Sequence, residues 1–160
     1  MSELENKRMQ LLEQIESIKQ MVSVKKIKIF QIDLLERLII RVFSFARSCE
    51  DCKQRIDNLE QMTASVANLI HKQDLDKNEK QIIIEYRKDI NNIVAHLHNK
   101  HKLVSEGYYM SIYMSIGMAI GVALGTAFGN IALGIPIGLS IGMAIGVGMD
   151  SDAKKKGLVI

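Results

Sequence analysis

The sequence has no tryptophan and few other aromatic residues, so it offers few rings on which nucleic-acid bases could stack. Its formal net charge is only +3, and its basic residues are mixed with acidic ones, so no strongly basic surface is indicated. We therefore expect no nucleic-acid partner. Glycine is absent before Gly107, and no strand or hairpin signal appears in that part, so the region is predicted to be helical.

Motifs of known catalytic chemistry are also missing. The chain contains no GxGxxG, P-loop, HExxH or GxSxG sequence, and no nucleophile is paired with a base. We expect neither enzymatic activity nor a cofactor. The N-terminus is charged and lacks the apolar core of a secretory signal peptide, so the two cysteines are expected to be reduced thiols in a cytosolic domain.

Charge divides the chain into two parts. The first 106 residues hold 34 of the 39 formal charges, whereas no charged residue or histidine occurs from Gly107 to Met149. This contrast indicates water as the solvent of the first part and lipid as that of the second. The sequence predicts an all-α fold with a cytosolic helical domain over 1–106, a transmembrane helical hairpin over 107–149 and a basic cytoplasmic tail over 150–160.

Apolar residues of the first domain recur at three- and four-residue steps, which predicts three amphipathic helices in a bundle or an imperfect coiled coil. The first helix is predicted over 2–47 and the second over 49–71. A capping box between Asp76 and Glu79 opens the third. No glycine or proline interrupts this helix before Gly107, so we expect it to run nearly unbroken into the hairpin.

Two segments of the first predicted helix have alternative interpretations. The apolar run at 34–45 fits the buried centre of the bundle, which we favour, or an interfacial helix whose Arg37 and Arg41 contact lipid head groups. The run VKKIKI at 24–29 fits a solvated helix face, which we favour, or a site for anionic lipid.

Two uncharged stretches of 19 residues, 110–128 and 131–149, are each long enough to span a bilayer, because such a helix measures roughly 28 Å. Gly129-Asn130 is the predicted turn, and Pro136 lies in the first turns of the second helix, where proline is tolerated. Lysines flank both outer ends, whereas the connection has none. The positive-inside rule therefore predicts a multi-pass protein of the cell membrane with both termini cytoplasmic.

Small residues recur every fourth position in both predicted spans. Such spacing keeps one helix face narrow, so that a second helix backbone can approach closely. The glycine series comprises Gly117, Gly121, Gly125, Gly129, Gly134, Gly138, Gly142 and Gly146. A second series is offset from it by about 200° around the helix and comprises Ser111, Ser115, Ala119, Ala123 and Ala127, with Ser140, Ala144 and Gly148 in the second span.

A lone hairpin needs only one small face per helix. We therefore expect the other face to pack against further copies of the chain, giving a homo-oligomer in the membrane. The alternative is that this face simply contacts lipid.

The stretches GMAIGVALGTAFGN and GIPIGLSIGMAIGVG resemble the repeated glycine zippers of small bacterial membrane proteins. Similar zippers occur in pore-forming toxins and channels. The resemblance covers about the last third of the chain. It implies close helix packing and assembly, and it identifies no activity.

These patterns predict a self-assembling integral membrane protein that forms an oligomeric pore or membrane-perturbing assembly, with the helical domain controlling assembly. Thr126 and Asn130 are the candidate polar residues of a pore, which would be narrow. One alternative is a non-conducting scaffold or anchor that recruits a protein partner through the N-terminal helices. A holin-like phage protein is another.

Two pairs of residues offer one candidate metal site. Cys49 and Cys52 are three residues apart, as are His98 and His101, with His96 nearby. Each pair would share a helix face, so the four would suit tetrahedral zinc if the second and third helices were antiparallel neighbours. The separation of the pairs matches no known zinc finger, so we favour incidental cysteines and exposed histidines and predict no metal. A redox CxxC is less favoured because no βαβ pattern surrounds it.

Overall fold

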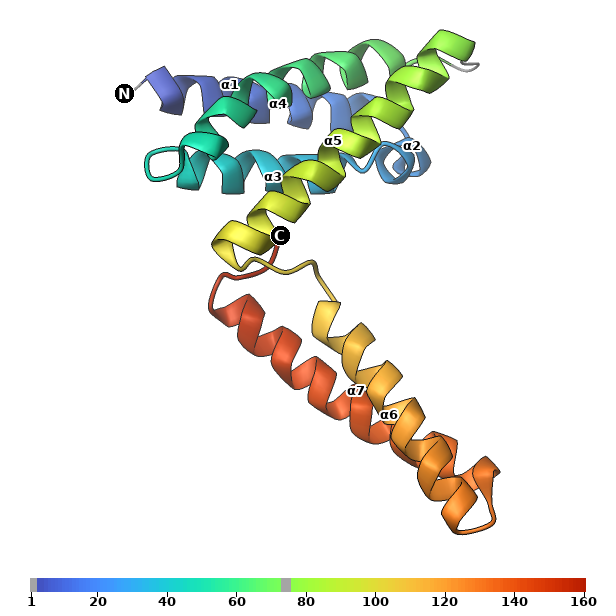
Figure 1. Cartoon of the computed structure of the whole chain (residues 1–160). Coiled ribbons are helices and arrows are strands. Elements are labelled where there is room, and N and C mark those ends of the chain that lie inside the picture. The colour runs from blue at the N-terminus through green and yellow to red at the C-terminus, as the bar shows by residue number, and fades with distance from the viewer. Residues whose placement is uncertain (1–2, 73–75) are drawn as a thin grey trace. The chain divides into compact units, whose positions relative to one another are not determined.

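The computed structural model describes residues 3–72 and 76–160, in which the regular elements are helices and no strand is present. The predicted all-α fold is confirmed. The chain divides into two compact units, Met1–His101 and Lys102–Ile160 (Figure 1). Within the described residues the first unit contains five helices and the second contains two.

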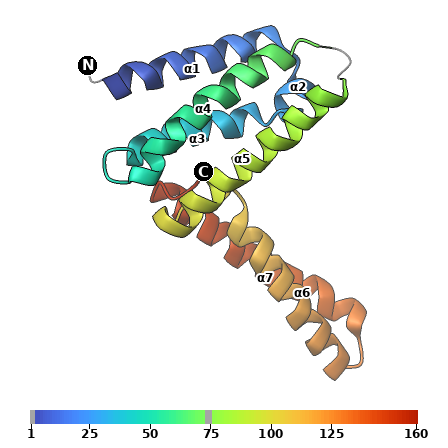
Figure 2. The same cartoon turned by 45° about the horizontal axis from the view of Figure 1, so that its top comes forward.

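The prediction of a single first helix over 2–47 was wrong. The structure divides it into α1 (Glu3–Met21), α2 (Val24–Ile29) and α3 (Ile32–Phe45). Gln31 adopts a left-handed conformation with φ of 52°, which turns the chain so that α3 packs beside α1 (Figure 2). The buried Tyr86 hydroxyl donates a hydrogen bond of 2.6 Å to the Phe30 carbonyl at this break. A contact from 56 residues away thus satisfies a backbone group that a continuous helix would have bonded.

The second and third predicted helices are α4 (Glu50–Leu69) and α5 (Lys77–His101). The predicted capping box is confirmed, because the Glu79 amide donates to Asp76 Oδ1 at 2.7 Å and the Asp76 amide donates to Glu79 Oε2 at 3.0 Å. The prediction that this helix continues toward the hairpin was wrong. It ends at His101, where Lys102 takes a left-handed conformation with φ of 57°.

Helix α3 forms the centre of the first unit. It contacts α1, α2, α4 and α5, and five of its apolar side chains are completely buried: Ile32, Leu35, Leu38, Ile39 and Val42. Burying each such side chain stabilises the fold by roughly 1.5–3 kcal/mol. The favoured prediction of a buried central segment is confirmed, and the interfacial alternative is excluded for these residues.

The basic run in α2 has a specific packing role. Lys26 Nζ donates to the carbonyl oxygens of Ile70 and Lys72, at 2.5 and 3.2 Å, just beyond the last turn of α4. A cation at a helix C-terminus satisfies carbonyls that lack a partner within the helix and interacts favourably with the helix dipole. Lys26 therefore docks α2 against the bundle, while Lys25 and Lys28 remain exposed.

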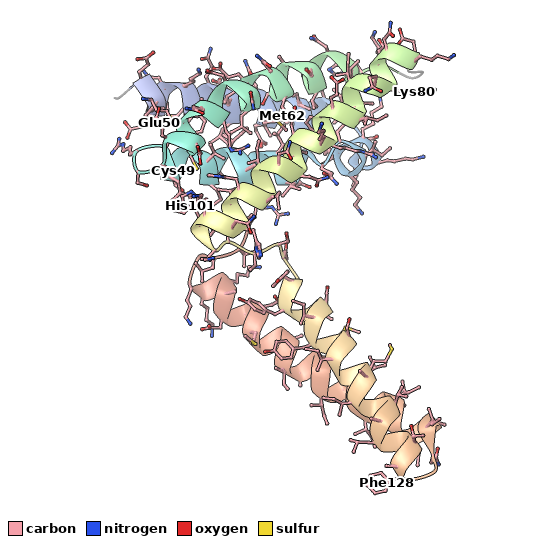
Figure 3. The ribbon with its side chains drawn as sticks, viewed as in Figure 1. Cys49, Glu50, Met62, Lys80, His101 and Phe128 are labelled. Carbon is pink, nitrogen blue, oxygen red and sulfur yellow. The ribbon has the colours of Figure 1, made fainter. Side chains whose placement is uncertain are left out.

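The second unit is a helical hairpin of α6 (Tyr108–Ala127) and α7 (Ile131–Lys155). The predicted turn is confirmed: Gly129 has φ of 70°, and the Asn130 side chain caps α7 by accepting from the Leu133 amide at 3.2 Å. Phe128 lies at the tip of the hairpin and is 81% exposed (Figure 3).

The segment predicted as a tail over 150–160 is largely ordered. Helix α7 continues to Lys155, so its last turns belong to the hairpin. Beyond it, Val159 forms an isolated parallel bridge with Val104, in which the Val104 amide donates to the Leu158 carbonyl at 2.8 Å. This pairing joins the two ends of the second unit.

Candidate functional site

Glycine forms the interface between α6 and α7. The buried residues of α6 are Gly117, Gly121 and Gly125, and those of α7 are Gly134, Gly138, Gly142, Gly146 and Ala153. A Cβ atom at Gly121 would lie 2.5 Å from the Gly134 carbonyl oxygen, and one at Gly125 would lie 2.7 Å from the Ile131 Cα. These obstacles are backbone atoms, which have little room to move. The glycines of the two helices are therefore used to pack the hairpin against itself.

Gly129 differs from the other glycines of the series. It lies in the turn, and a Cβ atom there would meet nothing within 4 Å. Its positive φ, a conformation that L side chains seldom adopt, accounts for glycine at this position. The structure thus gives Gly129 a turn-forming role instead of a packing role.

Asp150 closes the open end of the hairpin. The N-cap residue of α6 is Gly107, which has no side chain to offer its first amides. The Asp150 carboxylate accepts from the Tyr109 and Met110 amides instead, at 3.0 Å each. A carboxylate at a helix N-terminus satisfies unpaired donors and interacts favourably with the helix dipole.

Sequence reasoning placed Asp150 in the tail and missed this contact. The register of the zipper could have revealed it. Gly121 lies against Gly138, and continuing that antiparallel register places Tyr109 opposite Asp150.

The small polar side chains of the hairpin bond to their own helices. Thr126 Oγ1 donates to the Val122 carbonyl, and Asn130 caps α7. The serine hydroxyls behave likewise, with bonds of 2.7–2.9 Å from Ser111 to Gly107, Ser115 to Ser111 and Ser140 to Pro136. Such bonds satisfy hydroxyl donors where water is absent.

The outer surface of the hairpin is apolar. Only 17% of the apolar window of α6 and 22% of that of α7 is buried, whereas core helices of soluble proteins are mostly buried. Helix α6 has 20 residues and so measures about 30 Å, close to the hydrocarbon thickness of a bilayer. Large side chains point outward along both helices, among them Ile116, Ile120, Leu133, Ile137, Ile141 and Ile145. These features fit two membrane-spanning helices.

Small residues other than the buried glycines line a second face of each helix. We call these the outer small-residue faces: Ser111, Ser115, Ala119, Ala123 and Ala127 on α6, and Ala132, Pro136, Ser140, Ala144 and Gly148 on α7. All ten residues are exposed. A Cβ atom at Gly148 would meet nothing within 4 Å. Ala119, Ala123 and Ala127 thus do not take part in the packing of α6 against α7.

In the first unit, the structure brings Cys49, Cys52 and His101 together, as the sequence pattern suggested, but it places His96 beside them in place of His98. Figure 3 labels Cys49 and His101. His96 Nε2 lies 3.5 Å from Cys49 Sγ and 3.3 Å from Cys52 Sγ, and His101 Nε2 lies 3.3 Å from Cys52 Sγ. We call these four residues the Cys–His cluster.

The helical geometry of α5 explains why His96 joins the cluster in place of His98. Leu97 is fully buried, and His96 and His98 lie about 100° to either side of it around the helix. The start of α4, which carries the cysteines, lies on the flank of His96. The sequence spacing alone could not tell which flank would face α4.

Burial favours the neutral forms of Cys52 and His96. It raises the pKa of the Cys52 thiol to about 12. The pKa of His96 is lowered, first by burial and then by the Arg55 guanidinium. A buried thiol with a high pKa is a poor nucleophile, which disfavours a redox role for the CxxC pair.

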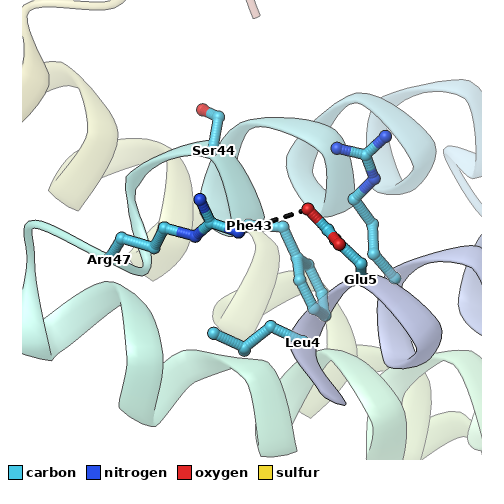
Figure 4. A pocket seen from close by; sticks show the side chains of 6 residues that line it. Leu4, Glu5, Phe43, Ser44 and Arg47 are labelled. Carbon is cyan, nitrogen blue, oxygen red and sulfur yellow. Dashed lines mark hydrogen bonds and ion pairs between the residues drawn. The ribbon is translucent and has the colours of Figure 1, made fainter. Parts of the chain in front are cut away.

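A surface pocket of about 230 Å³ lies between the start of α1 and the end of α3 (Figure 4). It is lined by Leu4, Glu5, Arg8, Phe43, Ser44 and Arg47. An ion pair of 3.2 Å between Arg47 and Glu5 crosses it, and both side chains are at least half exposed. Exposed pairs of this kind contribute little binding energy, so the pocket supports no ligand assignment.

Comparison with known families gives one match. Residues 104–152 match the model of a family described as glycine zipper membrane protein. Comparisons with curated proteins and with solved structures find no match. The matched segment contains α6 and nearly all of α7, and the first unit lies outside it. The resemblance to glycine-zipper proteins is therefore confirmed for the C-terminal region, and its two apolar, outward-facing helices mark the chain as a membrane protein in contact with lipid.

Proposed function

We propose that the protein is a self-assembling, non-catalytic membrane protein whose hairpins associate through their outer small-residue faces. One observation carries this proposal: the glycine faces are fully used within the hairpin, whereas the outer small-residue faces remain exposed on both helices. The glycines account for the hairpin, so assembly rests on this second set of residues.

Close approach of helices is the physical basis of such assembly. Lipid tails are as apolar as leucine side chains, so helices in a bilayer associate mainly through van der Waals packing. Small residues every four positions allow another backbone to come near. A hairpin with such a face on each helix can contact a neighbour on either side, which permits chains or rings of copies.

The orientation is also part of the proposal. Two spans place both ends of the hairpin on the same side of the membrane. Lys100 and Lys102 precede the first span, and Lys154, Lys155 and Lys156 follow the second. The positive-inside rule favours the cytoplasm for this side of the cell membrane. The five-helix unit would then be cytoplasmic, where it could control assembly or bind a protein partner.

The assembly would perturb or conduct across the bilayer, with Thr126 and Asn130 as the candidate polar lining. A non-conducting scaffold is the second candidate, and one observation favours it. The hairpin hydroxyls donate to their own helices, and Asn130 is engaged as a cap, so few polar groups are left to hydrate a lumen.

A paired substitution tests assembly. The full chain would be purified in a mild detergent, and its mass distribution compared with that of Ala119→Leu/Ala123→Leu. We expect oligomers for the wild type and their loss in the double variant, because leucine would hold neighbouring backbones apart. Val122→Leu, on another face of α6, is the matched control and should leave the oligomers intact. An unchanged distribution in the double variant would contradict assembly through this face.

Dye release from liposomes separates the two candidate activities. Release that rises with protein density and disappears in Ala119→Leu/Ala123→Leu supports a conducting assembly. Oligomers without release at any density support the scaffold. Growth arrest with membrane depolarisation on induction would favour a lytic, holin-like role.

A further inference from the structure

The Cys–His cluster has the composition and spacing of a complete metal site. Its four ligand atoms come from the start of α4 and the end of α5, and all lie within 4.8 Å of one another. With Zn–S bonds of about 2.3 Å and Zn–N bonds of about 2.0–2.1 Å, tetrahedral geometry places sulfur and nitrogen ligands about 3.5 Å apart. The three Sγ–Nε2 distances of 3.3–3.5 Å agree with that value.

Hydrogen bonds alone account poorly for this convergence. Neutral His96 Nε2 has one lone pair as acceptor, yet both thiol sulfurs lie within 3.5 Å of it. Cys52 has one weak S–H donor and a sulfur that accepts only weakly, yet this sulfur lies 3.3 Å from two ring nitrogens. A cation at the centre would engage all four atoms at once.

Two neighbouring side chains flank the imidazoles of the cluster. Asp51 Oδ2 lies 3.9 Å from His96 Nδ1, the ring nitrogen that faces away from the cluster. That distance is too long for a hydrogen bond, so the carboxylate supplies a nearby negative charge and does not fix the ring. The Phe45 ring stacks on His101 with a centroid distance of 3.9 Å and an interplanar angle of 19°, which fixes the plane of that imidazole.

We propose that Cys49, Cys52, His96 and His101 bind one Zn²⁺ ion in a structural site that joins the start of α4 to the end of α5. Two sulfur and two nitrogen ligands in a tetrahedron suit zinc, whereas magnesium and calcium require oxygen ligands. All four positions are filled by the protein, so no open position remains for catalysis. Binding deprotonates both thiols, so each Zn²⁺ taken up releases two protons and no electron is transferred.

The site would fix the boundary of the first unit. His101 is the last residue of both α5 and that unit, and Cys49 is the N-cap residue of α4. The metal would therefore join helix ends about 50 residues apart in sequence and stabilise the unit by an amount that grows with the logarithm of the free Zn²⁺ concentration above its Kd. This role is independent of the assembly proposed for the hairpin.

Metal content and cobalt spectroscopy of the full chain test the site. The protein would be purified in mild detergent with Zn²⁺ present, and bound zinc counted after removal of free metal. We expect one ion per chain. Replacement by Co²⁺ should give the intense visible bands of tetrahedral cobalt with thiolate ligands. Absence of retained zinc together with absence of these bands would overturn the proposal, and so would a Cys49–Cys52 disulfide in protein prepared without oxidant.

Variants identify the ligands. Cys52→Ser and His96→Asn should lose stoichiometric zinc. His98→Asn is the matched control, because it removes a histidine from the same turn of α5 and should leave zinc binding unchanged. A loss in His98→Asn equal to that in His96→Asn would contradict the assignment. Cobalt spectra of the wild type keep the test decisive if a ligand variant fails to fold.

Discussion

Gly121 lies so close to Gly134 across the hairpin that a Cβ atom on Gly121 would stand 2.5 Å from the Gly134 carbonyl oxygen. No flexible side chain lies between them. The two helices are therefore held at a distance that only glycine permits, and this distance sets the register of the whole hairpin.

Gly121→Ala should accordingly destabilise the hairpin, because the added methyl group pushes against backbone. Overpacking of this kind typically costs about 1–3 kcal/mol. The measurement is the free energy of hairpin unfolding in mixed detergent micelles. Gly148→Ala is the matched control: its Cβ atom meets nothing within 4 Å, and alanine favours the helix by about 1 kcal/mol. Equal losses in both variants would contradict the observed interface.

Asp150→Ala should loosen the open end of the hairpin, because the Tyr109 and Met110 amides lose their acceptor. Loss of a helix cap typically costs about 1 kcal/mol. Hydrogen exchange at these two amides should become faster, while exchange near the Gly129 turn stays unchanged. Asp152→Ala is the control, since Asp152 forms an exposed pair with Lys156 and its loss should have little effect. Faster exchange in Asp152→Ala alone would refute the role of Asp150.

Tyr86→Phe should destabilise the first unit, because the Phe30 carbonyl loses the hydroxyl that donates to it at 2.6 Å. An unsatisfied buried acceptor costs about 1–3 kcal/mol. Chemical unfolding of the full chain, followed through the helical signal of this unit, measures the loss. A stability equal to that of the wild type would show that this bond does not hold the break between α2 and α3.

Tyr86 also predicts how the stability of the first unit changes at alkaline pH. Burial raises the pKa of the Tyr86 phenol above its ordinary value. The pKa of this phenol is higher in the folded state than in the unfolded state. The stability that neutral Tyr86 contributes is therefore fully present below the unfolded pKa of about 10 and is lost as pH rises above it. The stability difference between wild type and Tyr86→Phe should therefore shrink above pH of about 10. A constant difference through that range would contradict the burial of the phenol.

The hairpin could be predicted from the sequence because its determinants are local. Glycine every fourth position, an uncharged run of spanning length and the Gly129-Asn130 turn each act within a few residues. The capping box of Asp76 and Glu79 was predictable for the same reason. Asp150 required one further step, the extension of the glycine register to the end of α7.

The break between α2 and α3 could not be predicted in the same way. Gln31 is neither glycine nor proline, and its left-handed conformation is supported by Tyr86, which lies far away in sequence. The choice of His96 over His98 likewise depends on which flank of α5 faces α4. Both features arise from tertiary packing, about which helical periodicity carries no information.

Energy transfer between copies in a bilayer tests the proposed assembly most directly. Donor and acceptor dyes would be placed at Phe128 through an encoded non-natural residue, since this side chain is 81% exposed at the hairpin tip and the native cysteines stay untouched. Assembly through the outer small-residue faces predicts transfer that persists as lipid is added and is lost in Ala119→Leu/Ala123→Leu. Transfer that falls with lipid dilution to the level of randomly distributed chains would contradict it.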